Sequence, residues 1–286
     1  MTIGITGASG QLAGLTIEKV LDQVEPSELV LITRSPEKVE QLAQRGATVR
    51  AGDFDEPAGL PAALAGIERL LIVSADDGRQ HLAAVEAAKQ AGVQHLIYTS
   101  IPNPTEANPS FVVEKHRATE EAIFASGLEW TILRNSLYAD FQLPTLSVAA
   151  ETGTLVHNNG DGACAYVTRD DCAAAAAAVL TGEGHAGQIF DVTGPELLTM
   201  ADLAVIASEV AGAQVEAIAV DDEAFAAGLV EHAGLPPEVA AGLATFGRAI
   251  REGQLSALST AVGDLTGREP QRLRDLFAAA YAGSAA

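Results

Sequence analysis

The sequence has few of the residues that mark several common classes of protein. Only two of its 286 residues are cysteines, Cys164 and Cys172, and they provide neither a disulfide framework nor the spacing of a metal site. We therefore expect no metal, and two reduced core thiols in a cytoplasmic protein. Basic residues are also scarce: 17 Lys and Arg oppose 38 Asp and Glu, which gives a formal net charge of −21. Such a surface repels nucleic acid, so we expect no nucleic-acid partner.

Long apolar runs are missing as well, although 48% of the residues are hydrophobic. None approaches the roughly 20 residues that a transmembrane helix needs, so we expect no membrane insertion. A strand-like run begins at Thr2, and we expect no signal or transit peptide before it. The chain is long enough to bury a large core in one or two domains.

A glycine turn near the N-terminus is the most informative feature that is present. Residues 2–6 are apolar enough for a buried strand, and apolar positions recur at helical spacing after Gln11. The turn between them contains Gly7 and Gly10, with Ala13 where a third glycine is usual. Such glycines let the backbone approach a pyrophosphate, whose charge the helix N-terminus attracts. The pattern favours a bound dinucleotide over a tight turn in some other α/β protein.

A second strand is predicted at residues 28–33, and Arg34 follows it, with Ser35 as helix N-cap and Pro36 in the first helical position. In dinucleotide folds the residue at this strand end contacts the adenine-side ribose. A carboxylate there favours NAD, whereas Arg34, with Lys38 one turn later, can bind the 2′-phosphate of NADP. The alternative is an ordinary solvated arginine. In so acidic a chain we favour NADP(H).

Strand-like and helical segments then alternate along the chain. Further strands are predicted at residues 47–51, 68–74, 94–100, 129–134 and 186–192. This rhythm predicts an α/β protein with a Rossmann-type, doubly wound parallel sheet. Helices dominate after residue 199, with one strand near 214–220, which indicates a smaller and mostly helical C-terminal domain.

The domain division follows from this change of pattern. Residues 1–134, completed by 164–193, are assigned to the NADP-binding domain. Residues 135–163 and 194–286 are assigned to a substrate-side domain that closes over the reactive end of the cofactor. A helical stretch is expected to begin the second domain at about Asn135.

Loops at the strand ends supply further candidates. Asp53 and Phe54 follow the third strand, where a loop lines the adenine pocket of doubly wound folds; turn chemistry, with Asp55 or Glu56 capping a helix, is an equal alternative. Ser74 leaves the fourth strand where the nicotinamide half would lie.

A capping box is predicted from Thr168 to Asp171, at the start of a helix with six consecutive alanines, 173–178. Its all-alanine face predicts a close approach to a neighbouring element. Asp170 and Asp171 are interpreted as carboxylates of the first helical turn and not as catalysts.

Together these motifs resemble, in order and nearly from end to end, those of the NmrA-like atypical short-chain dehydrogenases. The matching segments begin at Gly7, Arg34, Gly52, Tyr98, Leu133 and Ala165. Within that group the chain looks most like the bacterial type 2 NAD(P)H:quinone oxidoreductases. The resemblance implies an NADP-binding Rossmann domain, a small C-terminal domain and reduction of quinones without a flavin.

The resemblance also implies roles for individual residues. It implies contacts of Tyr138 with the substrate pocket, although Asp140 and Phe141 replace a Glu-Asn pair expected after it. The implied cofactor contacts are Gly7, Ala8, Ser9, Gly10, Gln11 and Leu12 at the phosphates, Arg34 and Lys38 at the 2′-phosphate, Asp53 and Phe54 at the adenine, and Ser74 and Thr99 at the nicotinamide.

The Tyr-x-x-x-Lys pair of typical short-chain dehydrogenases is absent, since none of the four tyrosines has a lysine four residues later. This argues against ketone–alcohol interconversion and epimerisation, which need its proton transfer. Reduction of a quinone depends less on a proton donor, because hydride addition gives a stable aromatic anion. Tyr138 is our candidate hydroxyl donor, with an aromatic packing role as the equal alternative; Lys115 and His116 are weaker candidates.

Two classes of function therefore remain. The first is NADPH-dependent reduction of quinones by direct hydride transfer. The second is a redox-sensing regulator that binds NADP(H) without turnover, and an enzyme for some other electron-poor acceptor is a weaker third. The exposed face of the helix predicted at 236–251 could support a homodimer or simply ordinary packing.

Overall fold

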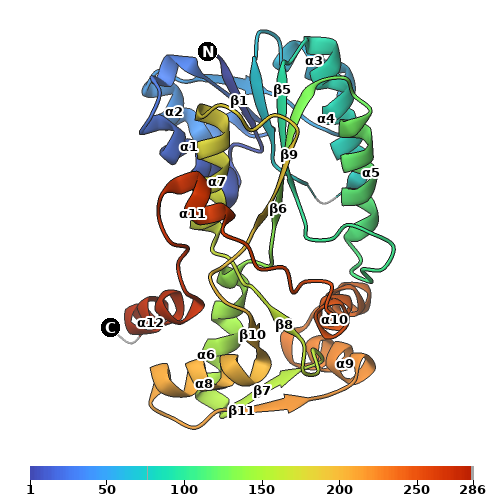
Figure 1. Cartoon of the computed structure of the whole chain (residues 1–286), viewed down its shortest axis with the longest axis vertical. Helices are drawn as coiled ribbons and strands as arrows, with labels where there is room; N and C mark the ends of the chain where they lie inside the picture. Colours follow the sequence, from blue (N-terminus) through green and yellow to red (C-terminus); the bar gives the residue numbers. More distant parts are fainter. Residues whose placement is uncertain (76, 285–286) are drawn as a thin grey trace.

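A seven-stranded parallel sheet forms the centre of the computed structural model, which describes residues 1–75 and 77–284 (Figure 1). Its strands lie in the order β3-β2-β1-β4-β5-β6-β9 and pair in parallel. They are β1 (Ile3–Thr6), β2 (Leu29–Thr33), β3 (Thr48–Ala51), β4 (Arg69–Ile72), β5 (His95–Ser100), β6 (Glu129–Asn135) and β9 (Gln188–Val192). The order reverses between β1 and β4, as in the Rossmann fold, so the predicted fold class is confirmed.

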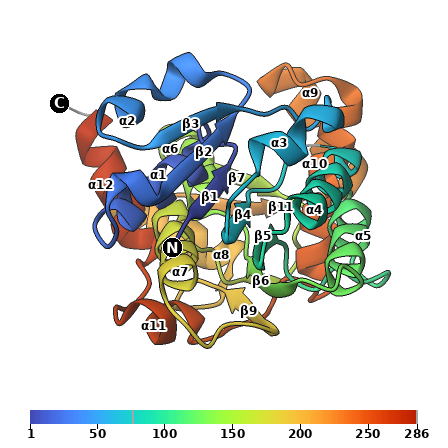
Figure 2. The same ribbon diagram turned by 90° about the horizontal axis from the view of Figure 1, so that it is seen from above.

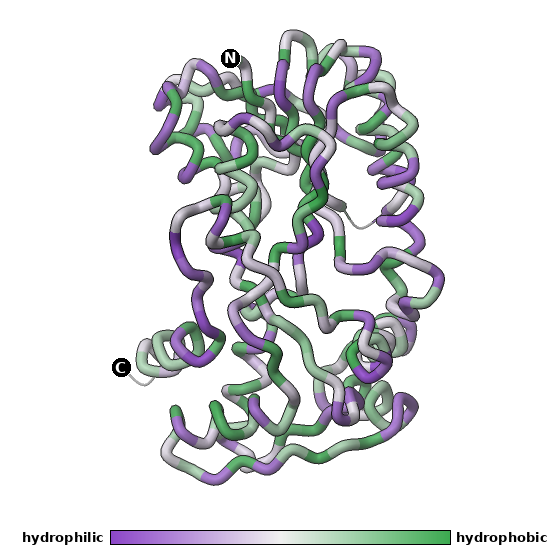
Figure 3. The backbone as a smooth tube through the Cα atoms, in the orientation of Figure 1, coloured by the Kyte–Doolittle hydropathy of each residue, from purple (hydrophilic) through white to green (hydrophobic). Residues whose placement is uncertain are grey.

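Helices cover both faces of this sheet (Figure 2). One face packs into a hydrophobic cluster with α1 (Gln11–Leu21), α2 (Glu40–Gln44), α7 (Arg169–Thr181) and α11 (Ala261–Thr266). The opposite face packs with α3 (Leu60–Ala63), α4 (Gly78–Ala91) and α5 (Val113–Phe124). Hydrophobic and hydrophilic residues alternate along outer helices such as α5, as expected where one helix face is buried (Figure 3).

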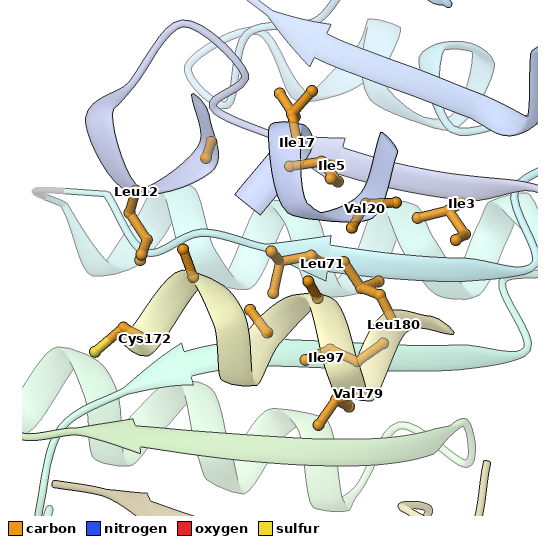
Figure 4. Packing of buried hydrophobic residues seen from close by; sticks show 14 of the residues in the cluster. Ile3, Ile5, Leu12, Ile17, Val20, Leu71, Ile97, Cys172, Val179 and Leu180 are labelled. Atoms are coloured by element: carbon orange, nitrogen blue, oxygen red, sulfur yellow. The ribbon is translucent and has the colours of Figure 1, made fainter. Parts of the chain in front are cut away.

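The alanine-rich helix α7 lies close against α1, as its small side chains predict. Ala173, Ala176 and Ala177 are buried in the same cluster as Leu12 and Ile17 of α1. Figure 4 shows Leu12 beside the N-terminal end of α7, near Cys172. Because alanine adds little bulk, the two helices can pack together over the sheet.

The remaining elements gather below the carboxyl edge of the sheet in Figure 1 and have a hydrophobic cluster of their own. It contains Leu146, Leu155, Leu203, Ile250 and Phe277. The elements are α6 (Gln142–Thr152), β7 (Thr154–His157), β8 (Ala163–Cys164), β10 (Leu198–Thr199), α8 (Met200–Ala211), β11 (Glu216–Ala219), α9 (Asp222–Ala233), α10 (Pro237–Arg251) and α12 (Leu273–Ser284). The tail returns to the sheet at α11, which packs on α7 and β9.

Some local predictions were wrong. The helix expected from about Asn135 starts later, because β6 continues through Asn135 and a 3₁₀ turn at Ala139–Phe141 precedes α6. Ser35 precedes the 3₁₀ helix Pro36–Val39, but its side chain makes no capping hydrogen bond. The sequence did not predict β7, β8, β10 or α11, whose lengths of two to six residues are too short for a clear period.

Candidate functional site

The crevice between β1 and β4 is where a doubly wound sheet accepts a dinucleotide, and the glycine turn lies at its edge. Gly7 has φ +62°, a conformation that favours glycine, and its carbonyl accepts a hydrogen bond of 2.7 Å from the Gly10 amide. A Cβ on Gly10 would lie 3.1 Å from that carbonyl oxygen. Gly10 is the N-cap of α1 without a side-chain cap, so a phosphate can meet the first amides of the helix.

The other members of the turn are fixed by β2 and by the core. The Ser9 hydroxyl lies 3.0 Å from the Thr33 hydroxyl, and the Ala8 amide donates to the carbonyl of Ile32. Leu12 is buried in the core, so only its backbone can face a phosphate. Ala13 is fully buried beside it, and its small side chain allows the helix to pack on the strands. Gln11 begins α1 with an exposed side chain.

Arg34 and Lys38 lie beyond the end of β2 with exposed side chains. Within residues 1–75 and 77–284, neither forms an ion pair, although 38 acidic residues are available. Two such cations one turn apart, next to the Ser9–Thr33 contact, fit a 2′-phosphate.

Asp53 and Phe54 follow β3 and are joined to the same edge, because the Gly52 amide donates to the Thr33 carbonyl at 3.1 Å. The Asp53 carboxylate accepts from the amide of Asp55 at 3.0 Å, so this aspartate, and not Asp55 or Glu56, makes the turn contact. Phe54 is half-buried against the cluster that contains α3 and α4. Its remaining exposed surface is available to an adenine.

Ser74 and Thr99 meet on the other side of the crevice. The Ser74 amide donates to the Thr99 hydroxyl at 2.9 Å, and the two hydroxyls are 3.3 Å apart. One residue earlier, the Val73 amide donates to the hydroxyl of Thr6 at 3.1 Å. These bonds continue the link between β1, β4 and β5 past the end of β4, so the chain leaves β4 in a fixed direction.

Tyr138 follows β6 at the same edge of the sheet. Its hydroxyl is 3.4 Å from the Asn135 amide nitrogen, and burial raises the pKa of Tyr138, which keeps the hydroxyl protonated. The Arg169 guanidinium lies 5.2 Å from the Tyr138 ring centre and 4.4 Å from that of Phe141. Asp140 binds the Arg169 amide at 2.9 Å and its guanidinium at 3.4 Å. The Asp140-Phe141 pair therefore belongs to this cation–aromatic cluster, and Phe141 is 62% exposed.

Sequence reasoning missed Asn135. Its side chain is 5% exposed, and Oδ1 has no hydrogen-bond partner among the described residues, next to the hydroxyl of Tyr138. A buried amide oxygen of this kind can accept a hydrogen bond from a ligand. Its position in the Leu133–Tyr138 motif was the only signal in the sequence.

His116 is not a free donor. It is buried, and its Nδ1 lies 2.8 Å from the Tyr98 hydroxyl. Burial, helped by His81 and Lys115, lowers the pKa of His116 to about 3, so the ring is neutral at pH 7. Lys115 donates to the carbonyl of Ala75 at 3.3 Å, just beyond Ser74.

Asp170 and Asp171 lie in the first turn of α7, as predicted. Asp171 is fully buried; it accepts from the Thr168 hydroxyl at 2.8 Å and from the Gln271 amide at 2.9 Å, and lies 2.6 Å from Arg268. The Thr168 hydroxyl caps α7 by accepting a hydrogen bond from the Asp171 amide. The Asp171 carboxylate, however, accepts from the Thr168 hydroxyl and not from the Thr168 amide, so the predicted capping box is wrong. The reciprocal box of this type is instead at Thr199 and Asp202 on α8.

The structure thus brings the predicted phosphate and adenine residues together at the ends of β1, β2 and β3, and Ser74, Thr99 and Tyr138 at the ends of β4, β5 and β6. No group of three or more His, Cys, Asp or Glu side chains suitable for a metal occurs in the described parts of the chain. No helix there is long and apolar enough to cross a membrane.

Comparison with known proteins decides the family. Residues 7–183 match the family described as NAD(P)H-binding, a span that includes the glycine turn, Arg34 and Tyr138. The chain belongs to this NAD(P)H-binding, NmrA-like family of oxidoreductases. Among its relatives is quinone oxidoreductase 2 of Escherichia coli, which is 35% identical over 277 residues that cover 96% of each chain.

Solved structures match 98% of this chain. The NADPH complex of the NADPH-dependent quinone oxidoreductase 2 from E. coli has a TM-score of 0.94 and 34% identity, covering 98% of this chain and 100% of that one. The NADP(H) complex of a Citrobacter triphenylmethane reductase has a TM-score of 0.91 and 37% identity, with the same coverage. The expected family and its cofactor class are confirmed.

Proposed function

We propose that this protein reduces quinones with NADPH by direct hydride transfer and without a flavin. The main support is the likeness to E. coli quinone oxidoreductase 2, which extends over 96% of both chains. The cofactor fits the residues present: Gly10 is an N-cap without a side chain, which leaves the first amides of α1 to a pyrophosphate, and Arg34 and Lys38 are exposed cations without ion-pair partners among the described residues.

The chain's own residues then have separate tasks. The turn from Gly7 to Gly10 binds the diphosphate, and Arg34 with Lys38 selects the 2′-phosphate. When bound, NADPH supplies the hydride. Ser74, Thr99 and the backbone of Val73 to Ala75 orient the nicotinamide side, and the protonated hydroxyl of Tyr138 donates a hydrogen bond to an acceptor oxygen.

We further propose that residues 135–163 and 194–286 form the substrate-side domain. The separate hydrophobic cluster formed by most of these residues supports this division, although Cys164 and Tyr166 also join it and α11 packs on the sheet instead. The rings of Tyr138 and Phe141, whose centres are 5.7 Å apart and whose planes are inclined by 45°, would present an aromatic surface to a conjugated acceptor.

The decisive measurement follows NADPH absorbance with a simple benzoquinone or naphthoquinone. We expect the protein to oxidise NADPH faster than the uncatalysed reaction, although its absorption spectrum shows no flavin. Adding a flavin should not increase this rate. NADPH binding is measured in parallel by its fluorescence. Binding without oxidation of any quinone would contradict the enzyme and support the redox-sensing regulator instead.

A second acceptor class is favoured by one observation. The chain lacks the Tyr-x-x-x-Lys pair, and an acceptor that is itself a delocalised cation becomes neutral on receiving hydride and needs no proton donor. The Citrobacter relative is named for reduction of triphenylmethane dyes, which are of this kind. We propose decolorisation of such a dye by NADPH as a second activity. A rate equal to that without protein would exclude it.

A further inference from the structure

A buried cluster of polar side chains lies behind the start of α4, apart from the residues discussed as ligands. We call it the His81 cluster: His81 on α4, Tyr98 on β5, and His116 and Thr119 on α5. Their exposed fractions are 0%, 0%, 5% and 0%. The Tyr98 hydroxyl lies 3.1 Å from His81 Nδ1 and 2.8 Å from His116 Nδ1, and His81 Nδ1 lies 3.2 Å from the Thr119 hydroxyl.

The outer nitrogen of His81 contacts the backbone that follows Ser74. Nε2 lies 2.7 Å from the amide nitrogen of Ala75 and 3.0 Å from its carbonyl oxygen. That carbonyl already accepts from Lys115 Nζ at 3.3 Å. The shorter contact and the second donor on the carbonyl both assign Nε2 as the acceptor of the Ala75 N–H.

One set of proton positions satisfies the whole cluster. With Nε2 bare, His81 carries its proton on Nδ1 and donates it toward Thr119 and Tyr98. Thr119 can accept because its own hydroxyl proton goes to the Lys115 carbonyl at 2.6 Å. The Tyr98 hydroxyl then donates to Nδ1 of His116. Every ring is neutral in this arrangement.

The bound peptide is part of the crevice wall. Val73 and Ser74 are tied to Thr6 of β1 and Thr99 of β5, on either side of β4. The next described amide, that of Ala75, is held by the His81 side chain. A Cβ on Gly78 would lie 2.7 Å from Cβ of Lys115, so α4 and α5 meet closely just behind this wall.

We propose that His81 is a positioning residue: its uncharged Nε2 holds the Ala75 peptide, and with it the nicotinamide-side wall of the crevice. The proposal rests on the proposed function for the identity of the ligand and for the position of its nicotinamide half. The ionisable groups that face His81 are Asp77 on the preceding segment, Tyr98, Lys115 and His116. Burial, the largest effect, lowers the pKa of His81; the nearby backbone carbonyl of Ala75 opposes it, Lys115 lowers the pKa further, and Asp77 raises it.

Two substitutions separate this role from simple packing. In His81→Gln the side-chain amide reaches the place of Nε2 and can accept from Ala75; in His81→Asn it reaches only the place of Nδ1 and keeps the inner contacts. We expect the Kd for NADPH, measured by fluorescence without any acceptor, to rise about fivefold in His81→Asn, since a lost hydrogen bond is worth about 1 kcal/mol. We expect His81→Gln to stay within about twofold of the wild type.

A matched control is His95→Asn, because His95 is a buried histidine near the opposite end of β5 that binds Thr131 at 2.8 Å. It should lower the melting temperature without changing the Kd. Equal Kd values for His81→Asn and the wild type, or equal losses in the Asn and Gln variants at position 81, would overturn the proposal. Because no quinone is present, failure of the quinone activity does not affect this result.

A measurement on the unaltered protein does not depend on how the variants fold. Nitrogen-15 NMR of the imidazole rings at pH 7 should show His81 protonated on Nδ1 and bare at Nε2. The opposite tautomer, or a doubly protonated ring, would refute the assigned contact with Ala75.

Discussion

Arg34 and Lys38 differ from most basic side chains of this protein because no carboxylate neutralises them in the part of the chain that the structure describes. The nearby arginine Arg45, by contrast, pairs with Glu18 at 2.8 Å. Leaving two cations unpaired beside the glycine turn makes sense if an anion binds there.

We expect Arg34→Ala to raise the KM for NADPH by about 10- to 100-fold, since a charge-assisted contact is worth about 1.5–3 kcal/mol. The KM for NADH should change little, because NADH lacks the 2′-phosphate. The matched control is Arg272→Ala, an exposed arginine before α12 that should leave both constants unchanged. Unchanged NADPH affinity in Arg34→Ala would remove Arg34 from this role.

Tyr138→Phe tests the hydroxyl while keeping the ring that packs under Arg169. If the hydroxyl donates to the acceptor, kcat with a quinone should fall about tenfold, and the Kd for NADPH should stay the same. A dye that needs no proton should be reduced at the wild-type rate. Equal kcat values with a quinone would favour the packing role for Tyr138.

At the scale of elements, the pairing of α1 with α7 shows how composition sets geometry. Asp170 adds an ion pair of 2.6 Å with Lys19 across the two helices, and buried Asp171 ties α7 to the C-terminal tail. The two acids that looked like generic first-turn carboxylates therefore connect distant parts of the chain.

We expect Ala176→Leu to lower the free energy of unfolding by about 1–3 kcal/mol, because the larger side chain overpacks the contact between α1 and α7. Urea unfolding measures this value. Ala174→Leu, the same change at a half-buried position of the same helix, should cost clearly less. Similar losses at both positions would show that the helix contact is not tightly packed.

At the scale of the whole molecule, five histidines have a lowered pKa chiefly because of burial: His81, His95, His116, His157 and His185. The unfolded chain then binds protons before the folded one does as the pH falls below 6.5. The contribution of these histidines to the free energy of unfolding is therefore fully present above the ordinary pKa of histidine. It is lost as the pH falls toward their pKa values in the folded protein.

For His116, with a pKa of about 3 against 6.5 in the unfolded chain, this loss between pH 7.5 and pH 5 amounts to about 2 kcal/mol. We expect urea unfolding of the wild type to show at least this difference, and His116→Asn to reduce it by about that amount. His232→Asn, at an exposed histidine of α9, should leave the difference unchanged. A pH-independent wild type would contradict neutral burial of His116.

The sequence by itself determined the fold class, the order of the main strands along the chain, and the family. These follow from local patterns: apolar runs, the glycine turn after residue 6, and Arg34 directly after the second strand. Each depends on residues close together in the chain, so periodicity and turn chemistry were enough. The strands near residues 154 and 163 were missed because they exist only through pairing with distant β11 and β10.

Only the tertiary structure decided which side chains are free and which are engaged. It joined Tyr98 to His81 and His116, placed Arg169 over Tyr138 and Phe141, and left Oδ1 of Asn135 without a partner among the described residues. These contacts join residues 17 to 31 positions apart or depend on the burial of one atom. Such relations arise when the sheet brings strand ends together, and no local pattern in the sequence encodes them.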